Sequence, residues 1–157
     1  MLRNKGGQTV IELVVVLPVF MMIIFVVLEL GNIAYHTLIA HHISYELARV
    51  GSMVGVRKPS GQADATRMQG KMRSALAKML GMSDPGKKVR FSSKIVHTST
   101  DPQVSFHKNE DLVVDIVYRL DLAYPLTSYV FASEPKKLGI LWIKANARMP
   151  IEKPLLN

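Results

Sequence analysis

The stretch that decides the fold is Gly6-Gly7-Gln8-Thr9-Val10-Ile11-Glu12, which an uncharged run from Leu13 to Leu28 follows. At about 1.5 Å per residue this run is close to the length that crosses a hydrocarbon core of about 30 Å, and residues 10–30 together are long enough. The sequence therefore predicts a transmembrane helix over about residues 10–30. Glu12 is unusual there, because a carboxylate buried in lipid costs about 2.5 to 3.5 kcal/mol. Such a residue needs a partner.

A short basic segment precedes the apolar run. Residues 1–7 contain Arg3 and Lys5 and end in two glycines, which lower helix propensity and are expected to leave an extended segment open to a protease. The positive charges favour a cytoplasmic N-terminus, with the C-terminal domain outside. A secretory signal peptide also begins with positive charge, but Glu12 interrupts this run, the run exceeds about 7 to 15 residues, and no Ala-x-Ala site follows it. An uncleaved signal anchor that carries an extracytoplasmic binding or enzyme domain is one alternative.

The spacing of these residues resembles the processing site of the type IV pilin superfamily, in which a basic leader ends in Gly and the new N-terminal helix has Glu at its fifth position. Gly7 would be the last leader residue and Gln8 the new N-terminus, so Glu12 is fifth. Within the superfamily, Pro18 and the later Glu29-Leu30-Gly31 are most similar to the TadE-like minor pilins or pseudopilins of tight-adherence (Flp) pilus systems. The resemblance is specific over residues 6 to about 50.

The resemblance implies a prepilin peptidase that cuts between Gly7 and Gln8, and a Glu12 that pairs with the α-amine of a neighbouring subunit. It implies a part in the assembly or priming of a pilus, together with the major Flp pilin, a second minor pilin, the inner-membrane assembly platform and the lipid bilayer. The expected location is the inner membrane as a single-pass protein, followed by incorporation into an extracellular pilus.

Two sequence details bear on the role within this superfamily. Leu13 stands where the major Flp pilins have Tyr, and the chain of 157 residues is much longer than theirs, so the main filament subunit is not expected. A type II secretion pseudopilin is a second alternative; that family usually has Phe at the position of Gln8.

Beyond residue 30 the pattern predicts one small α+β domain over residues 57–157. Apolar residues recur at three and four positions, so the first helix is expected over residues 8–56, with Gly51 and Gly55 marking its end. Pro18 should bend it, because proline removes a backbone donor. A second amphipathic helix is expected from near Asp64 to Leu80, closed by Gly81. Its several methionines are expected to pack in a core.

Alternating apolar residues predict three strands, at residues 89–95, 111–122 and 140–149. They are expected to form an antiparallel sheet that both helices cover on one face. Residues 124–131 are apolar without a clear period and are expected to form a short helix or a loop.

The side chains give no sign of enzyme chemistry. The chain has no cysteine and none of the common phosphate-binding, hydrolase or metalloprotease motifs. His36, His41 and His42 are expected to be surface or interface histidines, because a second pair of metal ligands is missing. The net charge of +8 is scattered along the chain, without interleaved aromatic residues, so nucleic acid is not an expected partner. We expect a structural protein with no catalytic residue, cofactor or metal.

Overall fold

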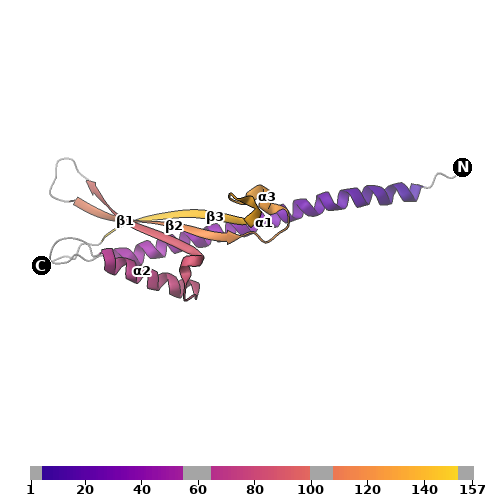
Figure 1. Ribbon diagram of the computed structural model, residues 1–157. Helices are drawn as coiled ribbons and strands as arrows, with labels where there is room; N and C mark the ends of the chain where they lie inside the picture. The colour runs from indigo at the N-terminus through magenta and orange to yellow at the C-terminus, as the bar shows by residue number, and fades with distance from the viewer. Residues whose placement is uncertain (1–4, 55–64, 100–107, 152–157) are drawn as a thin grey trace. The chain divides into compact units, whose positions relative to one another are not determined.

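The computed structural model describes residues 5–54, 65–99 and 108–151 (Figure 1). The helices are α1 (Lys5–Val54), α2 (Ala65–Leu80) and α3 (Thr127–Phe131), with two short 3₁₀ helices, η1 (Pro85–Lys87) and η2 (Lys136–Leu138). The strands are β1 (Val89–Ser99), β2 (Lys108–Asp121) and β3 (Ile140–Pro150). The sheet has the order β1-β2-β3. The α+β class predicted from the sequence, with a long apolar N-terminal helix, a second helix and a three-stranded antiparallel sheet, is confirmed.

Helix α1 is one continuous helix of 50 residues. Because it begins at Lys5, Gly6 and Gly7 are helical, and the expected extended segment is wrong at these two residues. Adding residues to an existing helix costs little compared with starting one, which explains how two glycines can extend a helix this long. Pro18 lies within α1 without ending it, so the local bend stays a prediction. Residues 1–4 of the expected leader and residues 55 and 56 of the expected helix lie outside the described part of the chain.

The sheet is antiparallel throughout. Strands β1 and β2 pair from Val89 opposite Tyr118 to Ser99 opposite Lys108, so β1 is longer than the alternation alone predicted. Strand β3 runs along the other side of β2: the Ile151 amide donates to the Glu110 carbonyl at 2.8 Å. Leucine, valine, isoleucine and tyrosine at alternate positions of β2 are buried as predicted: Leu112, Val114, Ile116, Tyr118 and Leu120.

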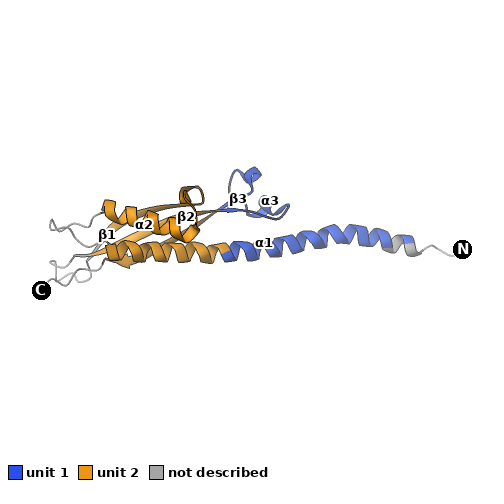
Figure 2. Cartoon of the chain, turned by 90° about the horizontal axis from the view of Figure 1, so that it is seen from below, with its two compact units in different colours: residues 1–35, 120–141 blue, residues 36–119, 142–157 orange. Residues whose placement is uncertain are grey.

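The chain divides into two compact units, which Figure 2 distinguishes by colour. Unit 1 comprises residues 1–35 and 120–141, and unit 2 comprises residues 36–119 and 142–157. In unit 2 the buried apolar side chains come from the second part of α1, from α2 and from the sheet. They include Ile43, Leu47, Met68, Met72, Leu76, Val89, Leu112, Val114, Ile116 and Ile143.

Two glycines of unit 2 have different roles. Gly81 follows α2 with φ +61°, and Met82 donates to the Ala77 carbonyl at 3.2 Å, so the glycine closes the helix as predicted. Gly51 does not mark a helix end, since α1 continues to Val54. A Cβ atom at Gly51 would overlap Leu112 and lie 3.0 Å from Met72 Sδ. Gly51 therefore permits the close packing of α1 in this core.

Candidate functional site

The site residues predicted from the sequence lie along the first part of α1. Gly7 and Gln8 are in the first turns of the helix, and Glu12 is one turn further on. Outside the adjacent residues and the local helix backbone, no atom of the described residues lies within 4 Å of the position that a Cβ of Gly7 would take. Glu12 is exposed, between Ile11 and Leu13, which are 67% and 65% exposed. A methyl group at Gly7 would therefore meet no described side chain.

The apolar side chains that follow Glu12 are exposed on all sides of α1. They are Leu13, Val14, Val15, Val16, Leu17, Val19, Phe20, Met21, Met22 and Ile23. The most apolar window of this helix has a mean hydropathy of 3.0, and none of it is buried within the described chain. Water is a poor solvent for such a surface, whereas lipid matches it. By length and composition, α1 is a candidate membrane span, consistent with membrane anchoring.

The most distinctive polar arrangement in unit 1 is centred on Glu29, which is fully buried. Its Oε2 atom accepts hydrogen bonds from the amides of Ala123 at 3.1 Å and Tyr124 at 3.0 Å, and lies 3.0 Å from Thr127 Oγ1. Its Oε1 atom accepts from Asn32 Nδ2 at 2.9 Å. Hydrogen bonds of this number compensate a carboxylate for the water it loses.

This arrangement, the Glu29 clamp (Glu29, Asn32, Ala123, Tyr124 and Thr127), holds the start of the α3 region on α1. One turn before Glu29, the ring of Phe25 stacks on Tyr124 with 5.9 Å between centroids and 16° between planes. Thr127 Oγ1 is also 2.7 Å from the Tyr124 carbonyl. Sequence reasoning placed Glu29 in the Glu-Leu-Gly motif but gave it no role. The available signal was the same as for Glu12: a carboxylate beside a long apolar run needs partners.

His36 occupies a half-buried position in unit 2. Its Nδ1 atom is 3.0 Å from the hydroxyl oxygen of Tyr118, and Lys88 Nζ lies 5.8 Å from the centre of the Tyr118 ring. Burial, and secondly the positive charge of Lys88, lower the pKa of His36 below its ordinary value. His41 and His42, in contrast, are exposed. Within the described residues, no three His, Cys, Asp or Glu side chains are grouped to hold a metal ion.

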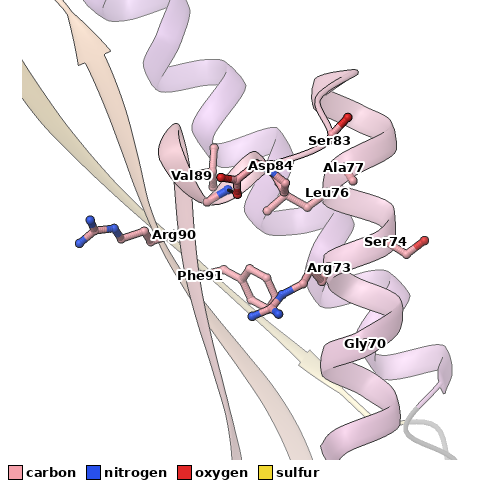
Figure 3. A pocket seen from close by; sticks show the side chains of 12 residues that line it. Gly70, Arg73, Ser74, Leu76, Ala77, Ser83, Asp84, Val89, Arg90 and Phe91 are labelled. Atoms are coloured by element: carbon pink, nitrogen blue, oxygen red, sulfur yellow. Dashed lines mark hydrogen bonds between the residues drawn. The ribbon is translucent and has the colours of Figure 1, made fainter.

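A cleft of about 660 Å³ opens in unit 2 between α2, η1 and the start of β1. Arg73 of α2 and Arg90 and Phe91 of β1 are among the residues that line it (Figure 3). Asp84 caps η1, since its carboxylate accepts from the Gly86 amide at 3.3 Å. The Asp84 carboxylate at this cleft therefore stabilises the backbone at the start of η1.

Over the described residues, these features define a protein with one candidate membrane helix and a small α+β portion. A buried carboxylate on that helix holds a segment that lies far along the chain. Residues 7–49 match the family model described as TadE-like protein. The match begins at Gly7 and contains Glu12, Pro18, Glu29 and His36, so the resemblance predicted from the sequence is confirmed over this stretch. It indicates involvement in a tight-adherence pilus system and association with other components of that system. No curated protein and no solved structure matches the chain.

Proposed function

We propose that the chain is a minor pilin or pseudopilin that takes part in the assembly or priming of a tight-adherence pilus. The observation that carries this proposal is the TadE-like match, which starts at Gly7 and covers Glu12. The role is structural rather than enzymatic. The proposed partners are a prepilin peptidase, the major Flp pilin, a second minor pilin and the assembly platform in the inner membrane.

In the proposed sequence of events, the precursor is held in the bilayer by α1, and the peptidase cuts between Gly7 and Gln8. Cleavage removes Arg3 and Lys5 from the end of the helix, and it creates a charged α-amine at Gln8. The exposed apolar surface from Val10 to Ile23 remains covered by lipid until helices of neighbouring subunits replace the lipid. A single helix with an apolar surface on all sides is suited to both environments, because lipid tails and packed helices are similarly apolar.

The deciding measurement is the N-terminal sequence of the mature protein in membranes, read by mass spectrometry. We expect it to begin at Gln8 in the presence of the peptidase, and to begin at Met1 or Leu2 in a peptidase-deficient strain. A wild-type protein that begins at Met1 or Leu2 in the presence of the peptidase, or that is cut near residue 35, would contradict the proposal.

Gly7→Leu and Gly31→Leu are a matched pair for this experiment. Both glycines are helical, and at both an added Cβ would meet no described atom within 4 Å outside the adjacent residues and the local helix backbone, so the two positions are comparable. We expect Gly7→Leu to accumulate as uncut precursor and Gly31→Leu to be cut normally. Equal processing of both variants would show that Gly7 is not read by the peptidase.

A further inference from the structure

The short segment of unit 1 that contains α3 and η2 exposes an unusual share of apolar side chains. Leu126, Tyr129, Val130 and Leu138 are 55%, 72%, 60% and 64% exposed. The segment is nevertheless ordered: Lys136 Nζ donates to the Tyr129 carbonyl at 3.1 Å, and α3 packs against η2. Single exposed apolar residues are common, whereas a cluster on a short held segment indicates a contact surface.

The backbone at Leu126 adds a second observation. Leu126 has φ 69°, a left-handed conformation that costs a leucine about 1 kcal/mol and that glycine or asparagine adopts more readily. A glycine here would relieve the strain and remove an exposed apolar group. A leucine at such a position therefore indicates that its side chain contacts something other than this chain.

The contacts that attach this segment to α1 show at which residues of the helix the segment lies. Phe25 stacks on Tyr124, and Glu29 accepts from Ala123, Tyr124 and Thr127. At about 1.5 Å per residue, Glu29 lies about 28 Å along the helix from Val10, where the exposed apolar surface begins. A hydrocarbon core is about 30 Å thick, so the segment lies where α1 leaves the bilayer.

We propose that the segment from Leu126 to Leu138 rests in the bilayer interface at the point where α1 emerges, with lipid as its partner. The exposed apolar surface of α1 continues to this level, since Val27, Leu28 and Leu30 are 60%, 45% and 49% exposed. The Glu29 clamp holds the segment at the same level of α1. Lipid that covers the exposed side chains of α1 at this level therefore also reaches the segment.

The composition of the segment fits an interface rather than the hydrocarbon interior. Tyrosine is enriched at membrane interfaces, where its ring is apolar and its hydroxyl remains hydrated. Lys137 can extend its ammonium group to lipid phosphates while its stem lies along apolar surface, whereas the Lys136 ammonium is held by the Tyr129 carbonyl. The exposed Glu134 offsets part of this charge, so apolar contact provides most of the attraction. The clamp keeps the Glu29 carboxylate paired at a depth where water is scarce.

The interfacial contact fixes how deeply α1 sits, because the segment and the helix are joined at Glu29. The proposed interfacial contact depends on α1 as a membrane span and not on the pilin role. A failure of the processing experiment would therefore leave the interfacial contact intact, and a failure of the quenching experiment below would leave the pilin role intact.

The test uses the full chain in vesicles of phosphatidylethanolamine and phosphatidylglycerol. Because the chain has no cysteine, single substitutions can carry an environment-sensitive fluorophore. The probe positions are Tyr129→Cys and Leu138→Cys, with Phe20→Cys as the deep reference and the exposed Ser92→Cys of β1 as the aqueous reference. Quenchers are a water-soluble ion, a lipid with a spin label at the headgroup and a lipid with a spin label deep in the acyl chain.

We expect the labels at positions 129 and 138 to emit at shorter wavelength than the label at 92, to lose quenching by the aqueous ion, and to be quenched most by the headgroup spin label. The label at 20 should be quenched most by the deep spin label. Aqueous quenching at both probe positions equal to that at 92 would overturn the proposal. Shielding from both lipid and aqueous quenchers would also overturn it, because the surface would then be covered by protein. Two probe positions are used so that the test still decides the question if one of the two variants does not fold.

Discussion

Oε2 of Glu29 lies 3.0 Å from Oγ1 of Thr127, a residue 98 positions later in the chain. The same oxygen accepts from the Ala123 and Tyr124 amides, so one side chain of α1 orders the turn that leads into α3. A hydroxyl has a single proton, and Thr127 also lies within hydrogen-bonding distance of the Tyr124 carbonyl. The two amides are therefore the donors that depend most on the carboxylate.

Glu29→Ala should release this turn. It removes the acceptor of two backbone amides, at a cost of about 3 kcal/mol, so the Ala123 and Tyr124 amides should exchange with solvent deuterium about a hundredfold faster. Hydrogen exchange of the full chain in micelles gives the measurement.

Asn32→Ala is the matched control for Glu29→Ala. It removes one donor to the other carboxylate oxygen and leaves both amides paired, so exchange should rise by about tenfold or less, for a loss of about 1 kcal/mol. Equal exchange in wild type and Glu29→Ala would mean that the carboxylate does not hold the turn.

Gly31→Ala and Gly51→Ala should have opposite effects on stability, although both glycines lie within α1. Among the described residues, no atom beyond the adjacent residues and the local helix backbone lies within 4 Å of the would-be Cβ of Gly31, so alanine should stabilise the helix by about 0.5 to 1 kcal/mol. At Gly51 the added methyl overlaps Leu112, and overpacking of this kind costs about 1 to 3 kcal/mol. Thermal unfolding in one detergent ranks the two variants against wild type. A Gly51→Ala protein as stable as wild type would show that the core of unit 2 adjusts to the methyl.

Unit 2 should lose stability in acid because of His36. Burial and the charge of Lys88 lower the pKa of His36 from its ordinary value of about 6.5. Between the lowered pKa and the ordinary value, the unfolded chain binds more protons than the folded chain. The contribution of His36 is therefore fully present above about pH 6.5 and is lost as the pH falls through the lowered pKa.

The difference in unfolding temperature between wild type and His36→Gln, measured across this pH range, isolates that contribution. Wild type should lose more stability than the variant as the pH falls. In Lys88→Gln the pKa of His36 should move back toward its ordinary value, which a titration of the His36 ring signals by nuclear magnetic resonance can follow. A stability difference that does not change with pH would rule out a role for His36 titration.

The sequence was sufficient for the features that depend on periodicity. The alternation in β2 identified each residue that is buried between Glu110 and Asp121, because side chains of a strand point to opposite faces in turn. The spacing of Met68, Met72 and Leu76 identified the buried side of α2. The expectation that the methionines of this helix pack in a core is wrong for Met79, which is 39% exposed. Segment type and apolar faces follow from local patterns of this kind.

The sequence was not sufficient where a residue acts through a distant partner. Glu29 gains its role from Ala123, Tyr124 and Thr127, and no local pattern joins residues so far apart. Gly51 was interpreted as a helix end because glycine usually breaks helices, whereas its use is a contact with Leu112 of β2. In both cases the tertiary fold, rather than propensity, determines what the residue does.

Glu12→Gln should separate membrane insertion and processing from assembly. Glu12 is exposed on α1, and the amide keeps the shape of the carboxylate, so the variant should insert and should still be cut after Gly7. Under the proposed function, the carboxylate pairs with the α-amine that cleavage creates at Gln8 of a neighbouring subunit. It can also pair with the amine of its own chain, one helical turn away. Both pairings disappear in the variant, but only the first joins subunits.

Crosslinking and co-purification with the other pilins measure the effect of Glu12→Gln, with wild type and the uncut Gly7→Leu protein as references. When one partner of a buried ion pair is lost, the charge that remains unpaired costs about 3 to 5 kcal/mol. We therefore expect Glu12→Gln to be cut like wild type yet to associate as poorly as Gly7→Leu, since one lacks the carboxylate and the other lacks the amine. If Glu12→Gln joined its neighbours as well as wild type, the carboxylate would have no part in subunit contact, and pairing with the amine of its own chain would account for Glu12 at the membrane surface.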